Sequence, residues 1–195
     1  MLQSHATQLA NDGYTTIPGV FSDEACNAIL QCIDVAAKDK STFRKSADLF
    51  AIRQFLNELP ETQQLILNAA LKSLINALFG PGYFVSKSIY FDKPAGSNWF
   101  VAYHQDLTIS VDQKIELPGF GPWSVKQDQY AVQPPLDILE DNFTIRIHLD
   151  DTDQGNGALK VVPGSHSKAV YRPETIDWKE EPEHICPVPR GGVMI

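Results

Sequence analysis

The chain has 195 residues, of which 43% are hydrophobic and 21% are charged, so it is long enough to bury one sizeable core. Its 24 acidic and 16 basic residues give a formal net charge of -8, which repels nucleic-acid phosphates and anionic lipid surfaces. We therefore predict no nucleic-acid partner and no membrane partner. The sequence lacks a run of the about 20 apolar residues that a spanning helix needs. The first residues lack a secretory pattern, which predicts a cytoplasmic location.

The three cysteines, Cys26, Cys32 and Cys186, are odd in number, and their spacing fits neither a disulfide framework nor a zinc site. We predict that they are reduced and mostly buried.

The first part of the chain has helical patterns. A short strand within 13–21 leads to Ser22, an N-cap residue, which is followed by the acidic Asp23 and an amphipathic pattern. Gly80 and the proline after it end the last pattern, while His5 lies before the first predicted element. The predicted helices lie at about 23–38, 47–56 and 61–79.

From Tyr83 onward, short apolar runs separated by Gly, Pro and Asn predict strands. The segment between Leu107 and Asp141 is rich in Pro and Gly and is predicted to be a long functional loop. We predict a single α+β, mainly β domain, 1–195, in which helices of about 22–80 pack outside a sandwich or small barrel of about 83–195. The predicted strands are 83–91, 100–104, 143–149, 158–162, 184–188 and 192–195.

The clearest chemical signal is YHQDLTI, in which His104 and Asp106 are two residues apart on a predicted strand end. Side chains at this spacing project from the same face of an extended chain. One imidazole and one carboxylate can share a metal ion, and a third ligand would complete the facial triad of non-heme iron oxygenases. A surface histidine beside a solvated aspartate is the alternative.

A second segment, FTIRIHLDDTDQGNGALKVVPGSHS, combines two strands with an Asn-Gly turn and a Pro-Gly-Ser-His turn. Together with HQD, KSIYFDKP and the N-terminal DGYTTIPGVFS, it resembles the phytanoyl-CoA dioxygenase family over about 11–195. The resemblance implies a double-stranded β-helix, which is a cupin-like jelly roll. It also implies Fe(2+) held by His104 and Asp106, and 2-oxoglutarate that is decarboxylated to succinate while a small organic substrate is hydroxylated by dioxygen.

In the family, a turn such as Gly191-Gly192 leads to a strand that carries a distal iron-binding histidine, and an arginine for 2-oxoglutarate follows. The sequence ends at Ile195, before either residue, so we expect a shortened jelly roll without its C-terminal strands. An open strand edge would permit self-association. The alternative function is a non-catalytic jelly-roll binding domain, or an inactive fragment of such an enzyme.

Five further residues are candidates for binding co-substrate or substrate. Arg146 and His148 alternate on the polar face of one predicted strand, and a guanidinium suits a carboxylate. The others are Lys93, Tyr103 and Trp123, a cation and two aromatics near the HQD motif. A cupin-like protein that binds another metal through His104, Asp106 and His148 is a third possibility. No residue is assigned as an acid or base.

Overall fold

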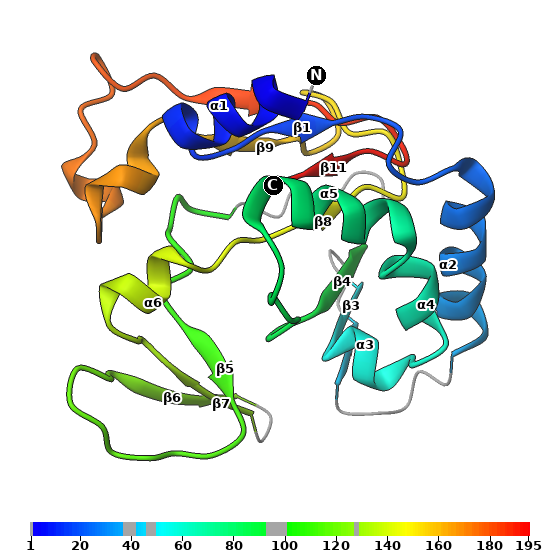
Figure 1. Cartoon of the computed structure of the whole chain (residues 1–195), viewed down its shortest axis with the longest axis horizontal. Helices are drawn as coiled ribbons and strands as arrows, with labels where there is room; N and C mark the ends of the chain where they lie inside the picture. Colours follow the sequence, from blue (N-terminus) through cyan, green and yellow to red (C-terminus); the bar gives the residue numbers. More distant parts are fainter. Residues whose placement is uncertain (1, 37–41, 46–49, 93–100, 127–128) are drawn as a thin grey trace. The chain divides into compact units, whose positions relative to one another are not determined.

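The structure is a computed structural model that describes residues 2–36, 42–45, 50–92, 101–126 and 129–195 (Figure 1). The chain forms two compact units, each assembled from separate segments of the sequence. The first unit consists of Met1–Val35, Glu61–Tyr83 and Thr144–Ile195. The second unit consists of Ala36–Pro60 and Phe84–Phe143.

Helix α2 (Asp23–Val35) confirms the first predicted helix. The hydroxyl of Ser22 accepts a hydrogen bond from the backbone N–H of Ala25 at 3.2 Å, which satisfies one of the free donors at the helix start. Three side chains at helical spacing form its buried face: Cys26, Ile29 and Ile33.

The predicted helix of residues 61–79 is divided into α4 (Thr62–Ile66) and α5 (Ala69–Phe79). Asn68 lies between them in extended conformation, and its side chain accepts a hydrogen bond from the backbone N–H of Leu71 at 3.0 Å. Asparagine is a strong N-cap, so the chain starts a new helix here although its apolar pattern continues.

The prediction that nothing ordered precedes Gly13 is wrong, because α1 (Leu2–Asp12) begins the chain. Its His5 Nδ1 lies 2.8 Å from the hydroxyl of Thr15, and that hydroxyl donates to Gln8 Oε1 at 2.7 Å. Thr15 is fully buried, so these bonds fasten the helix to the strand that follows. Helix α1 also contacts α5.

The first unit contains two antiparallel sheets. In one, β11 (Val193–Met194) lies between β1 (Thr16–Ile17) and β8 (Arg146–Ile147). The other pairs β9 (Leu159–Val161) with β10 (His184–Cys186). Their side chains form a common apolar core, which consists of Cys186, Val188 and Met194 with Tyr14, Leu159 and Val161 packed against it.

Arg190 joins α2 to the segment that follows β8. Its side chain is 26% exposed and donates to Asp23 Oδ1 at 3.1 Å, to Asn27 Oδ1 at 2.6 Å and to the Leu149 carbonyl at 2.9 Å. A planar guanidinium has enough donors for all three contacts. This single side chain therefore links three separate parts of the first unit.

The second unit also contains two antiparallel sheets. One has the order β2 (Phe43–Lys45), β3 (Phe50–Arg53) and β4 (Ile89–Asp92), with α3 (Phe55–Glu58) following β3. The helix predicted at about 47–56 is therefore wrong over β3. Phe50 packs its ring against Phe43 and Tyr90 with centroids 6.1 and 6.0 Å apart, and such cross-strand aromatic contacts favour the strand.

The other sheet lies in the segment predicted to be a long loop. It has the order β5 (Ile109–Val111), β7 (Gln129–Val132) and β6 (Trp123–Lys126), and α6 (Leu136–Glu140) follows it. The Pro and Gly residues are confined to the connections, while six of the eleven strand residues are β-branched or aromatic.

The mixed helix and strand architecture is confirmed. The predicted strands exist in shorter form, except at 100–104, where the described residues 101–104 form none. The jelly roll itself stays a prediction, because the described strands form sheets of two or three strands each. All three cysteines are free, with Cys26 and Cys186 buried and Cys32 half-buried. Within the described residues, every helix is too short or too polar to cross a bilayer.

Candidate functional site

The HQD segment belongs to the second unit and runs into β5 as an irregular, extended chain. Burial alternates along it: Tyr103 and Gln105 are half-buried, whereas His104 and Asp106 are exposed. This alternation is typical of extended backbone with one face toward the protein. The imidazole and the carboxylate therefore lie on the same outward face.

The imidazole of His104 is oriented by its own backbone. Its Nδ1 lies 2.7 Å from the carbonyl oxygen of Ala102, and a carbonyl oxygen only accepts hydrogen bonds. Nδ1 therefore carries the proton of the neutral ring, which leaves the lone pair on Nε2. Metal-binding histidines commonly have this arrangement, in which a backbone carbonyl fixes the ring and its tautomer.

The donors fit iron chemically, but they do not complete an iron site. His104 offers a nitrogen and Asp106 an oxygen, as a facial triad requires. Within the described ranges, however, the structure brings no three His, Cys, Asp or Glu side chains together as a metal cluster. We therefore derive no chemical step through a metal from these residues.

His148 belongs to the first unit, directly after β8, and its backbone pairs with the Gly191-Gly192 turn. Its Nδ1 lies 3.0 Å from the hydroxyl of Thr152, which itself donates to the carbonyl of Val188 at 3.2 Å. Because that hydroxyl has only one proton, Nδ1 is the donor in this pair. The lone pair is again on Nε2, which is buried and has no hydrogen-bond partner among the residues that the structure describes.

Burial lowers the pKa of His148, and the nearby positive charge of Arg146 lowers it further. The ring is therefore held neutral at physiological pH. Arg146 itself is exposed on β8. Arg146 is on the strand where the sequence placed it, whereas His148 lies just beyond the end of that strand; the predicted binding roles of both stay predictions.

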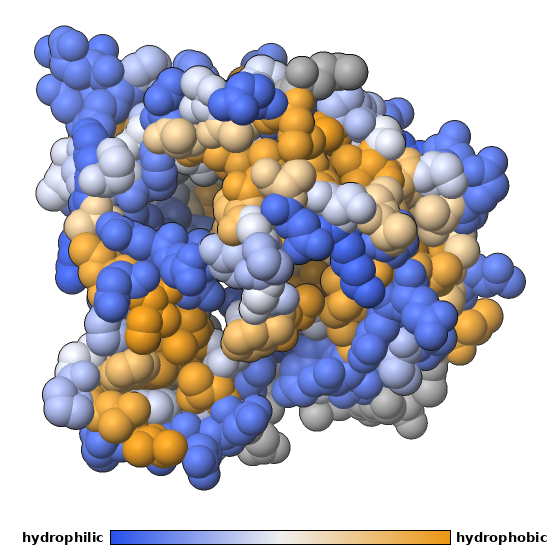
Figure 2. Space-filling view, in the orientation of Figure 1, coloured by the Kyte–Doolittle hydropathy of each residue, from blue (hydrophilic) through white to orange (hydrophobic). Residues whose placement is uncertain are grey.

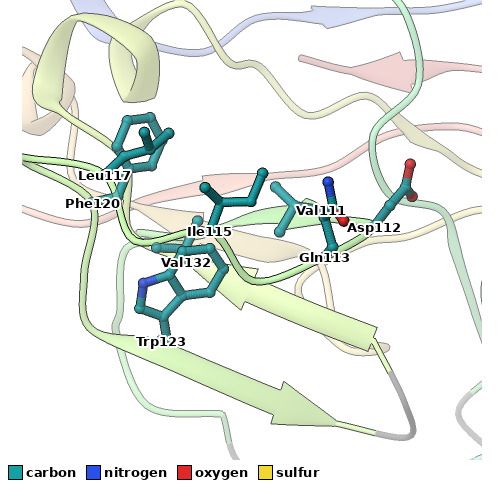
Figure 3. A pocket seen from close by; sticks show the side chains of 8 residues that line it. All are labelled: Val111, Asp112, Gln113, Ile115, Leu117, Phe120, Trp123 and Val132. Carbon is teal, nitrogen blue, oxygen red and sulfur yellow. The ribbon is translucent and has the colours of Figure 1, made fainter.

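A cavity of about 250 Å³ lies in the second unit, against the β5–β7–β6 sheet (Figure 3). Trp123 is part of its wall, and six of its eight lining residues are apolar. The sequence prediction included Trp123 and missed the others. Seven of the eight lie within residues 111–123, and pairing of β5 with β7 brings Val132 to them. The cavity is lined by Val111, Asp112, Gln113, Ile115, Leu117, Phe120, Trp123 and Val132.

Two features of the Trp123 indole bear on binding: the state of its Nε1 and the ammonium group near its ring. Its Nε1 is buried and lacks a hydrogen-bond partner within the described ranges, which is an unfavourable state for a donor. The Nζ of Lys114 lies 6.0 Å from the ring centroid, and the same ammonium pairs with Glu116 at 2.9 Å. Of the other predicted residues, Tyr103 is half-buried, and Lys93 lies outside the described residues.

A sequence model of the family described as phytanoyl-CoA dioxygenase (PhyH) matches residues 9–195, which confirms the resemblance. No curated protein was found to match the chain.

Solved structures share the fold at low sequence identity. The 2-oxoglutarate-dependent epimerase SnoN from nogalamycin biosynthesis is 15% identical with a TM-score of 0.60, and the alignment covers 99% of this chain and 70% of SnoN. The carbocyclase SnoK from the same biosynthesis is 17% identical with a TM-score of 0.59, covering 98% and 72%. HygX from Streptomyces hygroscopicus is 15% identical with a TM-score of 0.59, covering 98% and 76%. Such identities establish the fold alone.

Proposed function

Because the chain belongs to the phytanoyl-CoA dioxygenase family, whose members are 2-oxoglutarate-dependent oxygenase-type enzymes, we propose that it hydroxylates a small organic substrate with dioxygen. 2-Oxoglutarate would be decarboxylated to succinate in the same reaction. Iron and 2-oxoglutarate are the predicted cofactor and co-substrate. They agree with the relatives, since SnoN was crystallised with Fe3+ and α-ketoglutarate and HygX with nickel and 2-oxoglutarate.

The observation that carries the proposal is the shared outward face of His104 and Asp106. The Ala102 carbonyl holds Nδ1 of the imidazole at 2.7 Å, which directs Nε2 as the nitrogen that a metal would take. Asp106 adds a hard anionic ligand beside it. Iron, when bound, would supply open coordination positions for 2-oxoglutarate and dioxygen.

We extend the proposal to the architecture and to the remaining predicted residues. A single domain with a double-stranded β-helix is supported by the family match over residues 9–195, which includes segments of both units. Arg146, His148, Lys93, Tyr103 and Trp123 are retained as proposed binding residues. The substrate is proposed to be a small metabolite, as SnoN was crystallised with nogalamycin RO and HygX with hygromycin B. A cytoplasmic location is supported by the three free cysteines.

A non-catalytic binding domain is the second candidate. It is favoured by one observation, namely that the described residues do not gather a third metal ligand around His104 and Asp106. A cupin-like protein that binds a different divalent metal, without turnover, is the third candidate. Self-association remains part of this candidate, because β4 and β8 are edge strands of their sheets.

Anaerobic titration of ferrous iron into the chain, with and without 2-oxoglutarate, separates these candidates. The oxygenase proposal predicts a visible charge-transfer band that requires both additions and is lost in His104→Ala. His166→Ala is the matched control, because His166 is also exposed but lies in the first unit. A folded chain that gives no band, or a band that His104→Ala leaves unchanged, would contradict the proposed site.

A further inference from the structure

The cavity in the second unit has two chemically different ends (Figure 3). Phe120 and Leu117 lie at one end with Trp123 on the same side, Asp112 and Gln113 lie toward the other end, and Ile115 and Val111 lie between. Small-molecule sites commonly have this pattern of apolar walls with few polar groups that fix the orientation of the ligand. The space-filling view shows hydrophobic surface around this part of the unit (Figure 2).

The cavity is open to solvent, since Ile115 and Leu117 in its lining are 48% and 50% exposed, so its volume indicates the size of the ligand part that it can cover. An apolar cavity of about 150 Å³ accommodates benzene in a protein interior. At about 250 Å³, this cavity suits a ring system of roughly ten non-hydrogen atoms, which is a bicyclic group. The flat indole of Trp123 provides a stacking surface for such a group.

The charges at the polar end of the cavity determine which ligand charge it attracts. Within the described part of the chain, the Asp112 carboxylate has no hydrogen-bond or ion-pair partner, and Asp112 is exposed. The nearest basic residue in the sequence, Lys114, is paired with Glu116 at 2.9 Å. None of the eight described lining residues is basic, and although the Lys114 ammonium lies 6.0 Å from the Trp123 ring, Glu116 offsets its charge and the Asp112 carboxylate remains unbalanced. A carboxylate or phosphate would therefore be repelled, whereas an ammonium group would be attracted.

The cavity is also formed by residues that follow the HQD segment closely in the sequence. Strand β5, which ends at the lining residue Val111, begins shortly after Asp106. Even a fully extended backbone would place the Cα atoms of Asp106 and Val111 within about 18 Å of each other. A substrate anchored in the cavity would therefore lie within the same unit as the proposed metal ligands.

We propose that this cavity binds the apolar bicyclic part of an amine-bearing substrate, with the ring on Trp123 and the ammonium group toward Asp112. The identification of this ligand as the substrate rests on the proposed function, but the binding site itself does not. The inference therefore predicts binding in the absence of iron.

Ligand-observed NMR with three compounds of one ring system tests the site in the iron-free chain. The compounds are 1-naphthylmethylamine, 1-naphthylmethanol and 1-naphthoate, which differ mainly in charge. We expect millimolar binding in the order amine, alcohol, acid. Asp112→Asn should weaken amine binding by about two- to fivefold and leave the alcohol unchanged, as expected for an exposed charge pair.

The aromatic wall is tested separately. Trp123→Ala should weaken all three compounds by at least about tenfold, as loss of a central aromatic anchor does. Val125→Ala is the matched control, because Val125 is on the same strand but outside the cavity lining. Should Trp123→Ala fail to fold, Ile115→Ala offers a second test, since Ile115 lines the cavity and is 48% exposed.

Equal binding of amine and acid, or binding that survives Trp123→Ala, would overturn the inference. Amine binding without an iron-dependent band would support the cavity and contradict the proposed oxygenase function. An iron-dependent band without binding of any compound would support the oxygenase proposal and contradict the cavity proposal. The two proposals therefore fail independently.

Discussion

Replacing the partly buried Arg190 by alanine should destabilise the first unit more than the same change at the exposed Arg172. The side chain makes three hydrogen bonds, of which the one to the half-buried Leu149 carbonyl is worth about 1.5 kcal/mol because its donor is charged. The contacts with Asp23 and Asn27 involve exposed partners and contribute about 0.5 kcal/mol each. We expect a loss of about 2.5 kcal/mol of unfolding free energy, or about 5–10 °C in Tm.

Urea denaturation followed by circular dichroism measures this loss as a lower midpoint at an unchanged m-value. Arg190→Lys should lose about half as much free energy, since an ammonium keeps the charge but not the planar array of donors. Arg172→Ala is the matched control, because that side chain is exposed and makes no hydrogen bond or ion pair in the described structure. Equal midpoints for Arg190→Ala and Arg172→Ala would refute the reasoning.

Three further predictions concern single residues. Burial, and then the charge of Arg146, lowers the pKa of His148, so below about pH 6.5 the unfolded chain takes up a proton at this residue while the folded chain does not. The unfolding free energy should therefore fall as pH decreases. His148→Gln should reduce the slope of unfolding free energy against pH. Gly191→Ala should cost at least about 2 kcal/mol in urea denaturation, because φ is +75° and the new methyl group would collide with the Phe21 carbonyl oxygen. Asn68→Ala should remove the α5 cap and cost about 1 kcal/mol by the same measurement.

Each of these predictions has a matched comparison. An unchanged pH slope in His148→Gln, relative to His166→Gln, would mean that burial of His148 does not affect its protonation. Gly19→Ala has a similar positive φ but open space around it, so a loss equal to that of Gly191→Ala would disprove the collision. Asn68→Asp should retain the cap, and equal losses in Asn68→Asp and Asn68→Ala would exclude the capping role.

The sequence predicted best those features that depend on neighbouring residues. Helix α2 was predictable because its N-cap, its acidic first turn and its apolar spacing all agree. The outward face shared by His104 and Asp106 followed from the two-residue period of extended chain.

Features that depend on distant contacts were missed. Helix α1 has no fully buried residue of its own and is fixed by contacts with Thr15 and α5. The cavity brings Val111 together with Val132 through pairing of β5 with β7, and no local pattern reports such pairing. The break at Asn68 was a missed local signal, since a capping residue was present within a continuous apolar period.

Strand β11 is the central strand of its sheet, because it pairs with both β1 and β8. Both of these strands precede β11 in the sequence and are synthesised before it. During synthesis, β1 and β8 therefore emerge from the ribosome before the strand that joins them. Until then, both keep unpaired backbone groups on the sides that β11 will occupy. Such non-local pairing slows folding and prolongs the exposure of these edges. The yield of native protein in cells should therefore depend on chaperones that protect the nascent chain.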